Sequence, residues 1–133
     1  MSEQVPVTGR CECGAVRFAV TSALRDVVNC HCGQCRRFHG HVGAYTNAAR
    51  ADMRFDEERG LRWYQSSSFA QRGFCGECGS SLFWQRNSDD VISITAGALD
   101  GPTGLSTAIQ IFTEDRGDYY PFDTSIPIRP KSS

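Results

Sequence analysis

Cys30-His-Cys32-Gly-Gln-Cys35 places three cysteines within six residues, and two more cysteine pairs lie far from it in the chain. One pair is Cys11-Glu-Cys13 and the other is Cys75-Gly-Glu-Cys78. Both sulfurs of a C-x-x-C turn can reach one tetrahedral zinc ion at about 2.3 Å, and the two side chains of a C-x-C pair point the same way. The clusters therefore predict a protein that folds around zinc.

The seven thiols divide most simply into a set of four and a set of three. The first and third clusters together give a four-sulfur site made of Cys11, Cys13, Cys75 and Cys78, and a saturated site of this kind is structural. The remaining ligands are Cys30, Cys32 and Cys35, and three protein ligands leave one tetrahedral position open, as in catalytic zinc sites. Spacing alone also allows a site of Cys30, Cys32, Cys75 and Cys78, or purely structural roles for all seven thiols.

Glycines accompany the proposed ligands, and we expect them to supply the unusual backbone angles of tight cysteine turns. They are Gly14, Gly33, Gly76 and Gly79. Glycine neighbours also leave backbone amides free to hydrogen-bond thiolates.

The length and composition indicate one ordinary domain. The chain has 133 residues and a formal net charge of −1, so nothing in the charge favours binding to nucleic acid or anionic lipid. We expect a single zinc-binding domain over residues 5–125 and a loose C-terminal tail over residues 126–133, where two prolines disfavour a helix.

The cysteines also fit a reducing compartment. No apolar run approaches the roughly 20 residues that cross a bilayer, and residues 1–7 show no basic segment followed by an apolar one. We therefore expect no membrane segment, no signal peptide and a cytoplasmic protein. Thiols in a reducing cytosol usually serve metal binding or catalysis rather than disulfides.

Most of the chain predicts short β-strands, because β-branched and aromatic residues alternate in short runs between Gly, Asn, Asp and Ser clusters. The expected strands cover residues 15–20, 25–29, 42–46, 53–55, 61–65, 68–74, 81–85, 91–95 and 107–112. Only residues 33–39 look like a helical turn. The fold class is therefore mainly β, with antiparallel strands.

The three clusters and their flanks resemble the glutathione-dependent formaldehyde-activating family, also called the Gfa or centromere-protein-V-like family. The match covers most of the chain, and the three motifs stand in the family's order. They are Gly9-Arg-Cys11-Glu-Cys13-Gly-Ala-Val-Arg-Phe18, Cys30-His-Cys32-Gly-Gln-Cys35-Arg36 and Phe74-Cys75-Gly-Glu-Cys78-Gly-Ser-Ser-Leu82.

This resemblance implies an Mss4-like fold of short antiparallel strands stapled by zinc. It also implies the four-plus-three division: Cys11, Cys13, Cys75 and Cys78 match the structural zinc ligands, and Cys30, Cys32 and Cys35 match a second, open zinc. The family's activity is the condensation of glutathione with formaldehyde, classed as a carbon–sulfur lyase reaction. The expected partner is therefore a small-molecule thiol such as glutathione.

The chemistry of an open zinc suits this reaction, because a metal-bound thiol loses its proton near neutral pH and its sulfur can then attack a carbonyl. Arg36 and Arg37 follow the last ligand and are candidates to offset thiolate charge and to bind a glutathione carboxylate. The alternative function is a non-catalytic, zinc-stabilised protein-binding module. A glutathione-sized cleft beside Cys35 would favour the enzyme, and a flat apolar patch would favour the module.

Other polar and aromatic residues carry weaker expectations. Alternation points His31 away from the sulfurs, to a supporting or surface position rather than ligation. His39 and His41 are candidates for a fourth ligand or a proton shuttle, but isolated histidines more often occupy ordinary surface positions, and we expect them there. Four aromatic residues on the predicted strands are expected in the core rather than in a substrate cleft: Trp63, Tyr64, Phe83 and Trp84.

Overall fold

In a computed structural model, which describes residues 6–132, the chain forms short strands and one short helix. The strands are β1 (Val7–Arg10), β2 (Arg17–Val20), β3 (Val27–Cys30), β4 (Gly43–Ala49), β5 (Met53–Glu57), β6 (Leu61–Gln65), β7 (Ala70–Cys75), β8 (Ser81–Arg86), β9 (Val91–Thr95) and β10 (Thr107–Ile111). The helix is α1 (Gly33–His39), and 3₁₀ turns cover Arg50–Asp52, Ala96–Ala98 and Thr113–Asp115. Within residues 6–132, no helix has the length and apolar character needed to cross a bilayer.

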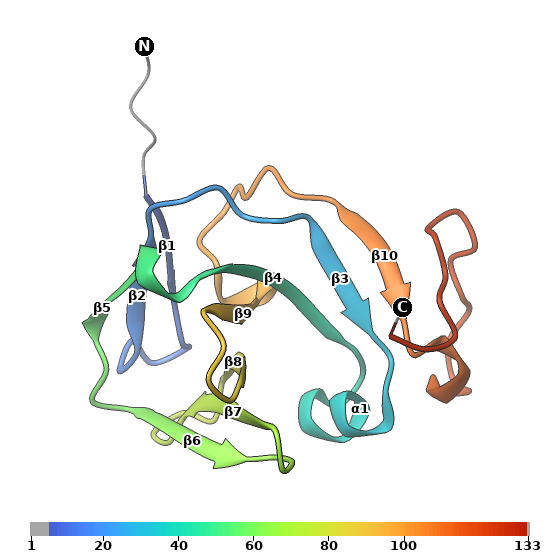
Figure 1. Ribbon diagram of the computed structural model, residues 1–133, viewed down its shortest axis with the longest axis horizontal. Helices are drawn as coiled ribbons and strands as arrows, with labels where there is room; N and C mark the ends of the chain where they lie inside the picture. The colour runs from blue at the N-terminus through green and yellow to red at the C-terminus, as the bar shows by residue number, and fades with distance from the viewer. Residues whose placement is uncertain (1–5, 133) are drawn as a thin grey trace.

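The strands form two sheets (Figure 1). In the smaller sheet β2 lies between β1 and β5, and the larger sheet has seven strands in the order β10-β3-β4-β9-β8-β7-β6. Across the described strands, every pairing is antiparallel except that of β10 with β3. The expected mainly β architecture of short antiparallel strands is therefore confirmed.

The parallel pair arises from the long connection between β9 and β10. This connection carries the chain to the far edge of the larger sheet, where β10 runs in the same direction as β3 (Figure 1). The Val27 amide donates to the Ser106 carbonyl at 2.8 Å, and the His31 amide donates to the Ile111 carbonyl at 3.0 Å. The second bond holds the backbone of the Cys30–Cys32 segment against the end of β10.

The core lies between the two sheets, and alternating side chains of β2, β8 and β9 fill it. Phe18 of β2 meets Phe83 of β8 edge to face, with ring centroids 5.3 Å apart. The core position expected for Phe83 is confirmed, since its side chain is fully buried. On the edge strand β6, Trp63 stacks on Phe83 at 6.0 Å while the next residue, Tyr64, is 55% exposed. The core position expected for Tyr64 was therefore wrong, because successive side chains of a strand face opposite ways.

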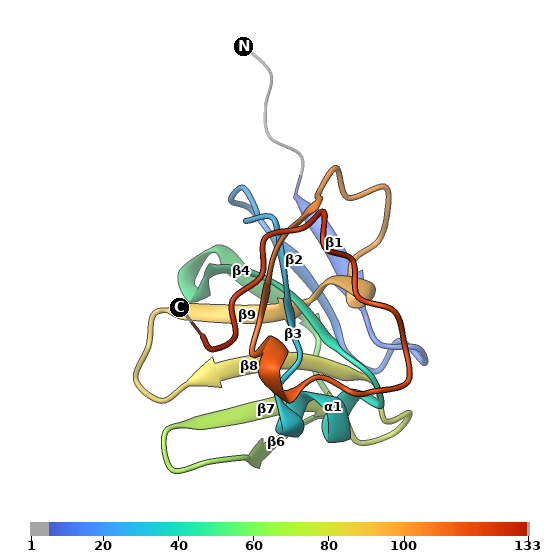
Figure 2. The same cartoon turned by 90° about the vertical axis from the view of Figure 1, so that its right-hand side faces the viewer.

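The C-terminal segment is attached to the larger sheet rather than loose. The Gln110 amide donates to the Pro127 carbonyl at 2.9 Å, and the Arg129 amide returns a bond to the Gln110 carbonyl at 2.8 Å. Gln110 and Ile128 form a parallel bridge, and in Figure 2 the segment, in red, doubles back after leaving the sheet. The expectation of a loose tail was wrong, because prolines prevent a helix but leave neighbouring carbonyls and amides free to pair with a strand edge.

Candidate metal centres

The four-cysteine cluster is built from two matching turns that face each other. Cys11 begins the turn after β1 and donates its amide to the Val16 carbonyl at 3.0 Å, and Cys75 ends β7 and donates to Ser80 at 2.9 Å. Each turn contains a glycine with φ of +84°, Gly14 in the first and Gly79 in the second. L-residues avoid this left-handed region, so both turns depend on glycine.

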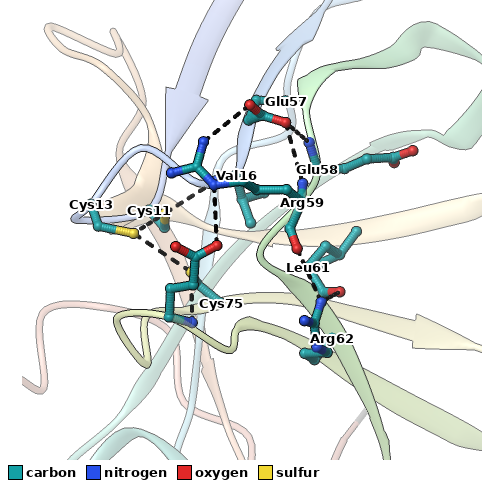
Figure 3. A network of polar contacts seen from close by, with 10 residues as sticks. Cys11, Cys13, Val16, Glu57, Glu58, Arg59, Leu61, Arg62 and Cys75 are labelled. Atoms are coloured by element: carbon teal, nitrogen blue, oxygen red, sulfur yellow. Dashed lines mark hydrogen bonds and ion pairs between the residues drawn. The ribbon is translucent and has the colours of Figure 1, made fainter.

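Backbone amides already point at two of the sulfurs. The Val16 amide lies 3.3 Å from Cys11 Sγ, and the Glu77 amide lies 3.4 Å from Cys75 Sγ. Such bonds stabilise thiolates and fix the orientation of metal ligands. Figure 3 shows the sulfurs of Cys13 and Cys75 facing each other, with Arg59 beside them on the neighbouring loop.

Arg59 does not contact the sulfurs. Its guanidinium pairs with Glu77 at 3.2 Å and with Glu57 at 3.2 Å, and its side chain is 60% exposed. These surface ion pairs contribute little to stability. They link the loop before β6 to the Cys75–Cys78 turn.

The three-cysteine cluster forms where β3 runs into α1. Cys30 ends the strand, Cys32 caps the helix, and Cys35 lies in the first helical turn and is buried. The Cys32 sulfur accepts from the Cys35 amide at 3.2 Å, so the capping bond itself sets the C-x-x-C geometry. Gly40 ends the helix in the left-handed conformation with φ of +81°.

Both clusters fit zinc. Tetrahedral zinc with Zn–S bonds of about 2.3 Å places its sulfurs about 3.8 Å apart. Cys13 Sγ lies 3.7 Å from Cys11 Sγ and 3.8 Å from Cys75 Sγ, and the sulfurs of each cluster all lie within 4.8 Å of one another. All seven thiols are free of disulfide bonds. Among the described residues, no fourth His, Cys, Asp or Glu joins the cluster of three.

The three thiols of the smaller cluster share their protons. Hydrogen bonds from Cys30 and Cys35 lower the pKa of the Cys32 thiol far below its ordinary value, and the nearby Arg72 charge acts in the same direction. Hydrogen bonding with Cys32 and Cys35, together with burial, raises the pKa of Cys30. The first thiolate of the cluster therefore forms easily at Cys32.

A buried polar network lies behind this cluster. Arg72 of β7 is 2% exposed, and its Nη2 donates to Gln34 Oε1 at 2.9 Å and to Cys35 Sγ at 3.5 Å. Its Nη1 donates to the Tyr45 hydroxyl at 3.2 Å, and that hydroxyl lies 2.7 Å from His39 Nε2. Since a guanidinium only donates, the Tyr45 hydroxyl accepts from Arg72 and has its own proton available for His39.

This network keeps His39 neutral. Burial, followed by the charge of Arg72, lowers the pKa of His39 to about 4. Burial also raises the pKa of Tyr45. Both rings are therefore neutral at pH 7, and Arg72 carries the charge of the network.

Comparison with known proteins agrees with this arrangement. Residues 6–115 match the family described as glutathione-dependent formaldehyde-activating enzyme. The chain belongs to this family. It is 28% identical over 116 residues to an uncharacterised lyase of Schizosaccharomyces pombe, covering 86% of this chain and 83% of the relative. It also resembles the crystal structure of a Rhodobacter sphaeroides protein, with 31% identity and a TM-score of 0.59, over 73% of this chain and 91% of the other.

The two sheets and two cysteine clusters are consistent with the zinc-stapled, Mss4-like fold expected for this family. The structure brings the seven cysteines together in the expected sets of four and three. The alternative set of Cys30, Cys32, Cys75 and Cys78 is wrong, since the first two of these sulfurs cluster with Cys35 and the last two with the N-terminal pair. Whether the Gfa-family roles of structural and open zinc apply remains a prediction.

Arg36 and Arg37 lie in α1, and neither forms an ion pair with an acidic residue within residues 6–132. Arg37 is exposed, while Arg36 is half-buried and its Nε has no hydrogen-bond acceptor within residues 6–132. Within residues 6–132, neither Arg36 nor Arg37 donates a hydrogen bond to a cysteine sulfur. Arg72 of β7, by contrast, donates to Cys35 Sγ.

Of the two histidines expected at the surface, His41 lies there and His39 does not. His31 does point away from the sulfurs, but it is 4% exposed, and its Nδ1 lies 2.5 Å from the Tyr120 hydroxyl. His39 is half-buried in the Arg72 network. Only His41 is exposed as expected, where its Nδ1 lies 3.2 Å from the Tyr119 hydroxyl.

A cavity of about 500 Å³ lies beside the four-cysteine cluster and reaches the end of α1. Arg10, Cys11 and Ser80 line it from the four-cysteine side, and His39 lines it from the helix. A cleft beside Cys35 would have favoured the enzyme, whereas this pocket adjoins the four-cysteine cluster and meets α1 only at His39. Among the described residues that line it, none is a cysteine of the smaller cluster.

Proposed function

We propose that the protein is a zinc-dependent enzyme of the carbon–sulfur lyase class that acts on the adduct of a small thiol with a carbonyl compound. Glutathione and formaldehyde, which the family's description names, are the first pair to test. The observation that carries the proposal is the cluster of Cys30, Cys32 and Cys35, which lacks a fourth protein ligand among residues 6–132. The S. pombe relative, named a lyase, supports the same reaction class.

The two clusters would have different tasks. Four sulfurs saturate a tetrahedral ion, so Cys11, Cys13, Cys75 and Cys78 would hold a structural zinc. Cys30, Cys32 and Cys35 would hold the second. When bound there, zinc would supply Lewis acidity that favours the deprotonated form of an incoming thiol.

The reaction needs no oxidant or reductant. In the direction of addition, a C–S bond forms, the thiol loses its proton and the carbonyl oxygen gains one. The chain's own contribution is to hold its thiolates in place and to orient the substrate. Arg36 and Arg37, in the helix that carries Cys35, would bind a substrate carboxylate, and the exposed Arg37 is free to do so.

The test is the rate at which glutathione and ¹³C-formaldehyde exchange with their adduct, measured by NMR with and without zinc-loaded protein. We expect the protein to accelerate exchange above the uncatalysed rate, and Cys32→Ser to abolish the acceleration. The Cys32→Ser protein keeps all four ligands of the larger cluster and is the matched control.

The same experiment judges the alternative of a zinc-stabilised binding module. A module would retain two zinc ions per chain and leave exchange at the uncatalysed rate for glutathione, cysteine and 2-mercaptoethanol alike. That result would contradict the proposed enzyme.

A further inference from the structure

Arg72 is a buried cation without a carboxylate partner. It is 2% exposed, and the ion pairs found among residues 6–132 are those of Arg54 and Arg59 with neighbouring acids, all at the surface. Its contacts are the neutral side chains of Gln34 and Tyr45, the sulfur of Cys35, and the face of Phe38, 5.1 Å from the guanidinium carbon. A buried charge without a counter-charge is strongly destabilising, so this arginine requires an anion.

Among its contacts within residues 6–132, the one group that readily becomes an anion is the Cys35 thiol, which clusters with the thiols of Cys30 and Cys32. Three thiolates around one divalent cation carry a net charge of −1. The charge of Arg72 brings that unit to zero.

The four-cysteine cluster has no equivalent. Among the described hydrogen bonds, no arginine donates to a sulfur of that cluster: Arg59 is directed to Glu57 and Glu77 (Figure 3), and Arg10 donates to the carbonyls of Cys11 and Glu12. That cluster includes the exposed Cys13, so water can screen its charge. The hydrogen bond from Arg72 to Cys35 Sγ therefore distinguishes the three-cysteine cluster from the four-cysteine cluster. The three-cysteine cluster is also the one that would leave a coordination position for a further ligand.

We propose that Arg72 is a positioning residue of the three-cysteine centre, which fixes Cys35 and cancels its excess negative charge so that an anionic fourth ligand can bind. A negative centre repels a thiolate, whereas a neutral one does not. The same argument predicts selectivity: Arg72 matters for an anionic ligand and matters little for a neutral one. The inference rests on the proposed function only in taking a small-molecule thiol as that ligand.

The neighbouring contacts make the placement rigid. Gln34 lies one residue before Cys35 and binds the same Nη2 that reaches the sulfur, and its own amide nitrogen donates to the Ser66 carbonyl at 2.9 Å. Tyr45 holds the other terminal nitrogen. The guanidinium is therefore held from two sides, which places its positive charge beside Cys35 Sγ.

The test uses protein loaded with Co²⁺ at both centres, whose charge-transfer absorption reports sulfur ligation. 2-Mercaptoethanol is the anionic probe and imidazole the neutral probe, each titrated at one pH. In Arg72→Gln we expect two Co²⁺ per chain, affinity for 2-mercaptoethanol reduced about tenfold or more, and affinity for imidazole within about threefold of the wild type. Arg86→Gln, which removes a strand arginine that lies over Phe69, should leave both affinities unchanged.

Arg72→Lys keeps the charge and loses the planar fork, so we expect its affinity for 2-mercaptoethanol to stay within about threefold of the wild type. This variant decides the question if Arg72→Gln does not fold. The proposal would be overturned if Arg72→Gln lost affinity equally for 2-mercaptoethanol and imidazole, or lost affinity for neither. It would also be overturned if Arg72→Lys lost as much affinity for 2-mercaptoethanol as Arg72→Gln does. Arg72-dependent binding of 2-mercaptoethanol without any catalysed exchange would contradict the proposed function alone.

Discussion

Gly60 shows how closely the backbone approaches the larger cysteine cluster. A β-carbon at this position would lie 2.8 Å from Cys75 Sγ and 2.8 Å from the β-carbon of Ala15. The Gly60 amide donates to the Ala15 carbonyl at 3.1 Å, and its carbonyl accepts from the Gly76 amide at 2.7 Å. Both bonds fix the loop, so it cannot move away to accommodate a side chain.

Gly60→Ala should therefore destabilise the zinc-loaded protein by about 1–3 kcal/mol, because the methyl group displaces Cys75 or Ala15. The measurement is urea unfolding, with zinc retention followed against a chelator. Gly97→Ala is the control, since a β-carbon there meets nothing within 4 Å. A Gly60→Ala protein as stable as Gly97→Ala would contradict the close approach.

At the scale of residues, the sequence predicted how the cysteines group but not the side chains that surround them. Cysteine spacing sets the metal chemistry almost by itself, because C-x-C and C-x-x-C restrict where two sulfurs can lie. Arg72 was missed because its partner, Cys35, is 37 residues away, and no short-range pattern joins them. The available signal was an arginine in the middle of a strand that ends on a buried Cys75.

At the scale of elements, alternation predicted strands better than it predicted their partners. The predicted helix and the strands β6 and β9 match their residue ranges, whereas β1 was not predicted as a separate strand. β1 has only four residues, and Gly9 within it breaks the pattern of β-formers. Gly9 is needed because a side chain there would overlap the ring of Phe18. The parallel pairing of β10 depends on a long connection, which periodicity does not describe.

Most of the segment after β10 lies beyond the family match, which ends at residue 115, and it packs on His31, the residue between Cys30 and Cys32. Tyr120 is its anchor: its hydroxyl lies 2.5 Å from His31 Nδ1, and its ring meets His41 edge to face at 4.5 Å. Phe122 packs on the other part of the His31 ring at 5.3 Å, and Arg116 lies over Phe122 at 4.9 Å. The segment therefore holds His31, which lies between Cys30 and Cys32, in place.

Tyr120→Phe should lower the free energy of unfolding by about 0.5–1.5 kcal/mol, because it leaves the buried His31 nitrogen without its partner. It should also speed tryptic cleavage at Arg116, since the segment is less firmly held. Urea unfolding and timed proteolysis measure the two effects. Tyr119→Phe, which alters an exposed side chain, should change neither. Equal cleavage rates for the two variants would show that Tyr120 is not the anchor.

At the scale of the whole molecule, the two cysteine clusters differ in what they connect. The larger cluster joins the turn after β1 in the smaller sheet to the turn after β7 in the larger sheet, and Cys13 and Cys75 are 62 residues apart. The smaller cluster closes a single local turn between β3 and α1. A crosslink between distant segments removes more conformational freedom from the unfolded chain than a local one.

Removal of the larger centre should consequently unfold the protein, while removal of the smaller one should not. We expect Cys75→Ser to lose its near-ultraviolet circular dichroism, because metal binding at such a site is coupled to folding. Cys32→Ser should lose about one zinc per chain, measured by mass spectrometry of the metal content, and keep the wild-type spectrum. If Cys32→Ser unfolds as Cys75→Ser does, both centres are structural, and the smaller one is not a site for substrate.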